Sequence, residues 1–268
     1  MKNSLLSDLV IRKGMTLSFQ NERMVELKLS DPIGKGTMTG HILSPHVVVC
    51  LVDFACEECP SMMPGSQFSG NDIVEHIKNV TKINSVPRST ENSDADKWLS
   101  INYCIKGRCE TDIPHAGVAV VSETDVCVSF SHTSNGSYEL PRSFRYPLAR
   151  YVGIEVFVCA EVLHEPEFSL LREPGNDVVY TWSQAGPSAI FSGDKELIAQ
   201  MKRASSAAQS SDWVQAKLAV LELLWALSRR NYILAKPRTL LTPAQLHMAK
   251  TAHDLIESSP TQPYDARD

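Results

Sequence analysis

The hydrophobic pattern of the chain changes once, near Ser192, and this change limits the folds that the chain can adopt. From about Met15 to Phe191, apolar residues form short or alternating runs separated by glycine and proline, a pattern typical of a β-barrel or sandwich. After Ser192, apolar residues recur at helical spacing almost to the C-terminus. We therefore expect an α+β protein with a β-rich domain over residues 1–191 and a helical segment over residues 192–268.

The β-rich part contains several strand-like runs and two segments of another kind. A helix is expected over residues 71–80, and residues 85–97 are expected to form a polar loop. Both would interrupt the series of strands. The clearest strand-like runs cover residues 47–52, 99–105, 118–121, 126–130 and 153–162.

Two helices are predicted directly after the β-rich part. The first covers residues 194–208 and the second covers residues 212–230. At the start of the second, the Asp212 carboxylate can accept hydrogen bonds from free backbone amides while Gln215 reaches back, as in a capping box. Apolar residues cover so much of this second helix that it must be buried against more than one neighbour.

A third helix is predicted over residues 242–259, and its start is the best-marked boundary in the chain. Thr242 is a suitable N-cap, and Pro243 follows at the first helical position. Gln245 completes a second capping box.

Composition and charge exclude several classes of protein. Of the 268 residues, 43% are apolar and 21% are charged, which is typical of a globular protein rather than a disordered or fibrous chain. The net charge of -5 gives no overall reason to bind nucleic acid or an anionic membrane. Residues 195–250 are locally basic, with nine Lys or Arg against three acids. This bias indicates either a solvated helix face or proximity to a phosphate backbone.

No segment is expected to enter a membrane. The chain lacks the run of roughly 18 apolar residues that a membrane span needs. Residues 1–16 lack the apolar stretch of a signal peptide. Seven cysteines is an odd number, which fits free thiols in a reducing compartment better than a disulfide framework. We therefore expect a cytoplasmic protein.

Residues 101–110 form a β-prone decamer with one cysteine on each side of Lys106 and Gly107. If these two residues form a hairpin loop, Cys104 lies opposite Cys109, with β-carbons roughly 5 Å apart. Such a pair is compatible with a metal site, a redox couple or simple packing.

The segment from Cys56 to Cys59 offers a second pair of thiols, with the two-residue gap that zinc sites and reversible disulfides use. A zinc site would need Cys104 and Cys109 as further ligands, and these are spaced differently. The acidic residues between Cys56 and Cys59 also raise a thiol pKa. Isolated thiols are the favoured interpretation, and a zinc or redox site on the four cysteines is the alternative.

The sequence contains no recognisable catalytic motif. It has no His-x-His pair of the kind that metal-dependent barrel enzymes use, no Gly-x-Ser-x-Gly elbow and no phosphate-binding glycine loop. Glu155, Glu161, Glu165 and Glu167 are expected to be surface acids. We therefore expect no enzymatic activity, no catalytic residue and no cofactor.

Four segments of the chain resemble the effector-binding half of AraC-type bacterial transcription regulators. The first is Tyr-Cys-x-x-Gly-Arg-Cys-Glu at residues 103–110, similar to that of anaerobe-associated members. The others follow in family order at residues 143–154, 221–224 and 241–245.

This resemblance implies a cupin-like β-barrel that binds a small effector of unknown identity, followed by helices that dimerise. It implies a homodimer formed through the helix at residues 212–230. DNA would be contacted only by a C-terminal helix-turn-helix domain that is absent from this chain, so the chain alone is expected not to bind specific DNA. In such a barrel, aromatic residues that could line the effector pocket are Trp98, Tyr103, Phe130 and Phe144.

Elemental analysis of the purified protein distinguishes the sensor from its alternative, a metal-dependent cupin enzyme or a cysteine-based zinc or redox sensor. We expect folded protein without stoichiometric metal. About one zinc or iron per chain would instead support the alternative.

Overall fold

An antiparallel sheet followed by helices makes up the part of the chain that the computed structural model describes: residues 9–60, 98–113, 117–130, 132–133, 136–137, 143–172, 188–230 and 242–258. This arrangement confirms the predicted α+β class. The helix expected at residues 71–80 and the loop expected at residues 85–97 lie outside the described residues. Among the described helices, none has the length and apolar content needed to span a bilayer.

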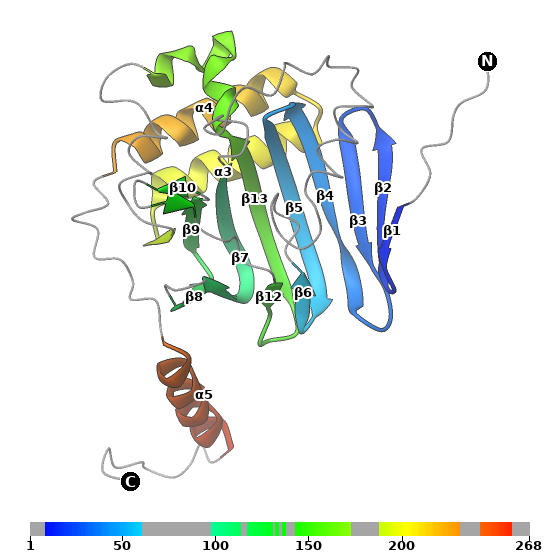
Figure 1. The fold of residues 1–268 in the computed structure, drawn as a ribbon, viewed down its shortest axis with the longest axis vertical. Coiled ribbons are helices and arrows are strands. Elements are labelled where there is room, and N and C mark those ends of the chain that lie inside the picture. The colour runs from blue at the N-terminus through cyan, green and yellow to red at the C-terminus, as the bar shows by residue number, and fades with distance from the viewer. Residues whose placement is uncertain are drawn as a thin grey trace.

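The large sheet contains twelve strands, with β5, β13 and β7 adjacent at its centre (Figure 1). From β5, the sheet continues through β4, β3, β2 and β1 to one end. From the first half of β7, it continues through β9 and β14 to the other end. The second half of β7 pairs with β8 and with β12, and β12 pairs with β6. The strands are β1 Leu9–Arg12, β2 Met15–Asn21, β3 Met24–Leu29, β4 Gly34–Ser44, β5 Val47–Cys56, β6 Glu58–Pro60, β7 Trp98–Ile113, β8 Gly117–Ser122, β9 Asp125–Phe130, β12 Ser143–Arg145, β13 Tyr151–Cys159 and β14 Ser188–Ser192, with β10 His132–Thr133 and β11 Gly136–Ser137 in a separate pair.

The three predicted helices are confirmed as α3 (Lys195–Gln209), α4 (Trp213–Ser228) and α5 (Pro243–Ser258), preceded by the 3-10 helices η2 (Ala160–His164) and η3 (Pro166–Arg172). The Asp212 side chain accepts a hydrogen bond from the Gln215 amide at the start of α4. At the start of α5, Thr242 and Gln245 exchange the hydrogen bonds of a capping box. These starts were predictable because a cap depends only on residues a few positions apart.

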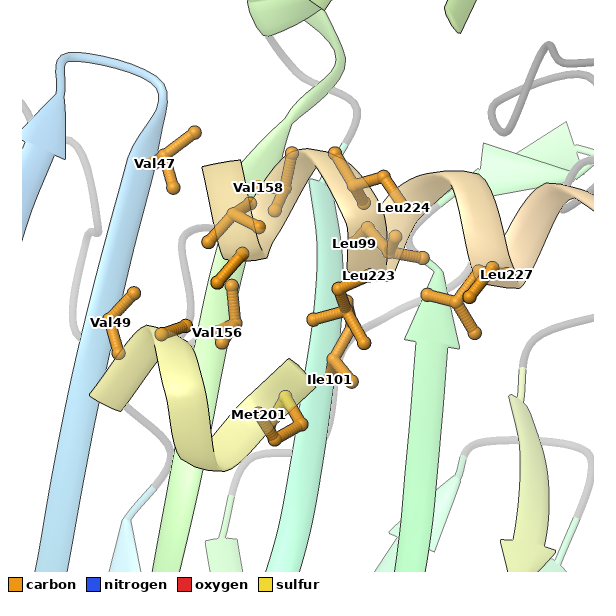
Figure 2. Packing of buried hydrophobic residues seen from close by; sticks show 14 of the residues in the cluster. Val47, Val49, Leu99, Ile101, Val156, Val158, Met201, Leu223, Leu224 and Leu227 are labelled. Atoms are coloured by element: carbon orange, nitrogen blue, oxygen red, sulfur yellow. The ribbon is translucent and has the colours of Figure 1, made fainter. Parts of the chain in front are cut away.

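Alternate side chains of the central strands point to opposite faces of the sheet, and α3 and α4 cover one of them (Figure 1). Figure 2 shows Ile101 of β7 and Val156 of β13 packed beneath Met201 of α3 and Leu223 of α4. All four side chains have no exposed surface. We call this side the helix-covered face and the opposite side the inner face.

The sheet curls around its inner face. One hydrophobic cluster joins Leu17 and Leu27, from β2 and β3 at one end of the sheet, to Val121 of β8 and Cys127 of β9 at the other. Side chains from strands that are far apart in the sheet order meet only if the sheet bends toward them. This curled, half-barrel sheet confirms the predicted cupin-like architecture.

The hairpin predicted at Lys106 and Gly107 is wrong, because β7 continues through these residues as one strand. Its first half pairs with β13, and its second half pairs with β8. Between these halves, Lys106 pairs with Val152 and Cys104 pairs with Gly153, so Ile105 is the extra residue of a β-bulge. The bulge bends the strand where the local sequence resembles a turn, so Cys104 and Cys109 do not face each other across a hairpin.

Gly107 is required at this bend. Its φ is +93°, and a β-carbon at this position would lie 2.2 Å from the carbonyl oxygen of Arg150. Its amide donates a hydrogen bond to Glu123 Oε1 at 3.1 Å. The strand can therefore pass close to the chain before β13 only with glycine at this position.

We predict that Gly107→Ala destabilises the fold much more than Gly193→Ala. Both residues have a positive φ, but a β-carbon at Gly193 would meet no atom within 4 Å. Gly193→Ala should therefore cost only the left-handed backbone strain, about 1–2 kcal/mol. Gly107→Ala should cost roughly twice that or more, since an overlap with backbone adds to the strain. Urea denaturation of both variants measures the difference, and equal losses would contradict the account of the bend.

Candidate ligand-binding site

A row of side chains crosses the middle of the inner face and contains the only acidic residue of β13, Glu155. Strand register places Glu155 between Cys50 of β5 and Asn102 of β7, and Cys127 of β9 beyond Asn102. All four residues are buried. The row therefore sets a carboxyl group among thiols and an amide, inside a sheet whose other inward residues are mostly apolar.

A chain of hydrogen bonds holds Glu155 in place. The Asn102 side-chain amide donates to Glu155 Oε1 at 3.0 Å, and the Tyr151 hydroxyl donates to Asn102 Oδ1 at 2.5 Å. Burial raises the pKa of Glu155 from 4.5 to about 7. The hydrogen bond from Asn102 favours the charged form, but loss of hydration has the larger effect. Near neutral pH, this carboxyl group can therefore exist with or without its proton.

Gly153 makes room for the Tyr151 ring. A β-carbon at Gly153 would lie 2.5 Å from the Tyr151 hydroxyl oxygen and 2.8 Å from two ring carbons. The ring thus lies over the glycine and carries its hydroxyl along β13 to Asn102. Any side chain at Gly153 would displace the tyrosine and break the chain of hydrogen bonds that ends at Glu155.

A second polar group adjoins this row toward the edge of the sheet. Ser129 of β9 and Ser188 of β14 are directly paired, and the Ser129 hydroxyl donates to the Ser188 hydroxyl at 3.3 Å. Cys127 Sγ lies 3.5 Å from the Ser188 hydroxyl. The inner face therefore offers hydroxyl and amide groups beside the carboxyl group of Glu155.

Water reaches the polar row more than the opposite face of the same strands. Glu155 and Asn102 each retain 8% of their surface, whereas their chain neighbours Val156 and Ile101 retain none. The helix-covered face is sealed, and the inner face keeps accessible polar surface. This combination of apolar surroundings and a few polar groups is typical of small-molecule sites.

Among the described residues, five thiols and phenols act electrostatically with Glu155, and each of the five is a neutral acid near pH 7. Burial raises the pKa of each of these thiols and phenols above its usual value, so none carries a charge that could balance a carboxylate. They are Cys50, Cys109, Cys127, Tyr146 and Tyr151.

The four aromatic residues predicted to line a pocket lie in different places. Tyr103 and Phe130 belong to the helix-covered cluster, and Lys202 of α3 lies 5.7 Å from the centre of the Tyr103 ring. Trp98 lies on the inner face with Cys50 of the polar row. Phe144 is half-buried and packs against the inner-face cluster that contains Leu17 and Cys127. Of the four, Trp98 shares a cluster with Cys50 of the polar row, and Phe144 packs against the cluster that contains Cys127.

The four cysteines of the alternative metal site, Cys56, Cys59, Cys104 and Cys109, lie buried within one hydrophobic cluster. Burial raises the pKa of Cys56 to about 11 and that of Cys104 to about 12. A thiol must lose its proton to bind zinc or attack a disulfide, so these groups are poorly prepared for either role. Within the described ranges, no group of three or more His, Cys, Asp or Glu is arranged to hold a metal ion.

The interpretation of Glu155 as a surface acid is wrong, and the sequence contained a signal against it. Glu155 is the one charged residue in an otherwise apolar nine-residue strand, and a charge at such a place is buried on one face of the sheet. The other acids lie nearer the surface. Glu161 and Glu165 contact the two ring nitrogens of His46 at 3.0 and 2.9 Å.

The chain is similar to known proteins only at low sequence identity, among solved structures. No protein-family model matches the chain, and no curated protein matches it. Among solved structures, fatty-acid-bound ToxT from Vibrio cholerae is 10% identical over 63% of this chain and 61% of its own length, with a TM-score of 0.36. The AraC-like transcriptional activator CuxR is 12% identical over 90% of this chain and 73% of its own, with a TM-score of 0.41. Oxalate decarboxylase is 8% identical over 68% of this chain and 38% of its own, with a TM-score of 0.21. At such scores, function has to be argued from the residues of this chain.

We predict that Glu155 makes the protein less stable as the pH rises. Between about pH 4.5 and 7 the folded protein keeps a proton on Glu155 that the unfolded chain releases, so the free energy of unfolding falls over this range. Glu155→Gln removes this effect. Relative to the wild type, the variant should gain about 2–3 kcal/mol between pH 5 and pH 8 in urea denaturation. Glu22→Gln, at an exposed position, should show no such gain. Parallel pH profiles for wild type and Glu155→Gln would contradict the prediction.

Proposed function

We propose that this chain is the small-molecule-sensing and dimerisation region of a cytoplasmic, AraC-type transcription regulator. Sensing is assigned to residues 1–191 and dimerisation to residues 192–268. DNA contact is assigned to a helix-turn-helix domain of the kind that the family has. The proposal is supported by the family-like motifs, by the polar row on the inner face and by the surface of α4.

The observation with most weight concerns adjacent residues in β7 and β13. In each strand, one residue belongs to the polar row and the adjacent one packs against the helices on the other face. In β13, Glu155 lies on the inner face and Val156 packs against the helices. In β7, Asn102 lies on the inner face and Ile101 packs against the helices. A ligand that shifts either strand would also shift the surface on which α3 and α4 rest. Because closely packed interiors transmit small displacements, this arrangement suits a sensor.

The second support is that α4 has two apolar sides. One side, which includes Ala219, Leu223 and Leu227, is fully buried against α3 and the sheet. On the opposite side of the helix, at spacings of 4, 3 and 4 residues, lies a stripe formed by Val214, Leu218, Leu221 and Trp225. Leu221 is partly buried and also packs against the helix-covered cluster, whereas the other three are exposed. Val214 is 68% exposed and Trp225 is 45% exposed.

An isologous dimer would bury this α4 stripe against its copy. In such a contact each stripe packs on the same residues of the partner, and a tryptophan near the centre commonly provides much of the affinity. The Arg229 guanidinium lies 3.9 Å from the centre of the Trp225 ring, which holds the ring in place on the helix surface. Effector binding would then favour one arrangement of the paired helices over another.

We predict that the protein is a dimer and that Leu218→Glu or Trp225→Glu makes it a monomer, because either change places a charge inside the α4 stripe. Light scattering measures the mass of each variant. Gln215→Glu is the matched control, because it adds the same charge to an exposed position of α4 outside the stripe, and it should remain dimeric. A monomeric wild type would overturn the dimerisation proposal.

A further inference from the structure

We propose that the polar row on the inner face selects a small organic cation, an amine with an apolar body, and that Glu155 is its counter-ion. This inference rests on the proposed sensing function for its biological meaning. It goes beyond that function because it assigns a chemical class to the effector and a residue to its recognition.

The first argument is the unbalanced charge. Glu155 accepts one hydrogen bond, at Oε1 from Asn102, and Oε2 accepts none within the described part of the chain. Three thiols on β5, β7 and β9 and the phenol of Tyr151 on β13 interact with it electrostatically, and none of these four groups can supply a positive charge. An ionised, buried carboxylate with a single amide donor is costly, and a cation beside it removes much of that cost. A ligand with a positive charge would therefore stabilise the ionised form of Glu155.

The second argument is the surroundings of the carboxyl group. Phe157 follows Glu155 on the same face of β13, about 7 Å along the strand, and clusters with Trp98 of β7. On the other side of Glu155, the rings of Tyr146 and Tyr151 are stacked with their centres 5.0 Å apart. Aromatic rings bind both apolar bodies and organic cations. A carboxyl group between two aromatic pairs thus fits an amine that carries an apolar or aromatic body.

The third argument concerns other classes of ligand. A carboxylate ligand would be repelled by ionised Glu155, and the structure places no cation beside the row within the described residues to offset this. A neutral polyol could bind the protonated form of Glu155. Its affinity would not rise with pH, so pH dependence separates a polyol-type site from an amine site.

The test compares paired probes that differ only in their charged end. Calorimetry on the full chain at pH 8 would measure 2-phenylethylamine against 3-phenylpropanoate, and tryptamine against indole-3-propanoate. We expect saturable binding of at least one amine and no binding of its carboxylate counterpart. Because Glu155 must lose its proton to pair with the amine, amine affinity should rise about tenfold from pH 6 to pH 8, given the pKa of about 7.

Three variants test whether amine binding and its pH dependence come from Glu155. Glu155→Gln should weaken amine binding at least tenfold and abolish its pH dependence. Glu155→Asp should weaken binding but keep the pH dependence, since the charge is retained on a shorter side chain. Glu22 is an exposed acid on the turn between β2 and β3, so the Glu22→Gln variant should bind amines as the wild type does.

The results separate this inference from the proposed function. Three results would each overturn the cation site. The carboxylates could bind as strongly as the amines or more strongly, no amine could bind at millimolar concentration, or Glu155→Gln could bind amines with unchanged affinity. The wild-type comparison needs no variant, so it decides the question even if a variant fails to fold. The dimer measured by light scattering is independent of these titrations, and a stable dimer without amine binding would leave the sensing and dimerisation proposal standing.

Discussion

The structure depends on the pleat of its two central strands, β7 and β13. Because successive side chains of a strand point to opposite sides, two layers with different chemistry form from one short stretch of chain. One layer, with Ile101 and Val156, is fully buried beneath α3 and α4. The other, with Asn102 and Glu155, is polar and keeps some contact with water. A shift of register by one residue would exchange these layers and bury the carboxyl group beneath the helices.

The helix-covered layer stabilises the polar row that it cannot touch. Burial of a carboxyl group and an amide costs free energy, which the apolar packing on the opposite side of the same strands offsets. Gly153 and Tyr151 add a local condition, because the glycine lets the ring reach Asn102. The candidate site is therefore a polar exception inside a sheet that is otherwise stabilised by apolar contacts, as functional sites commonly are.

Sequence patterns predicted the parts of the fold that depend on near neighbours. The class, the three helices and the caps at Asp212 and Thr242 follow from residues within a few positions of one another. The continuous strand through Gly107 was not predictable in the same way, since Lys-Gly favours a turn locally while pairing with β13 and β8 keeps the strand unbroken. Glu155 was missed for a related reason: its burial depends on β5 and β7, which lie far away in the sequence.

The bend at Gly107 has a consequence for how the protein unfolds. The first half of β7 pairs with β13 and β9, and the second half pairs with β8 and β12, so a single strand joins two groups of strands. Neither set of partners can separate from β7 without exposing the apolar residues that the other set covers. We therefore expect the sheet to melt in one cooperative transition, and folding to be slow because β7 has to find β13 some 50 residues further along the chain.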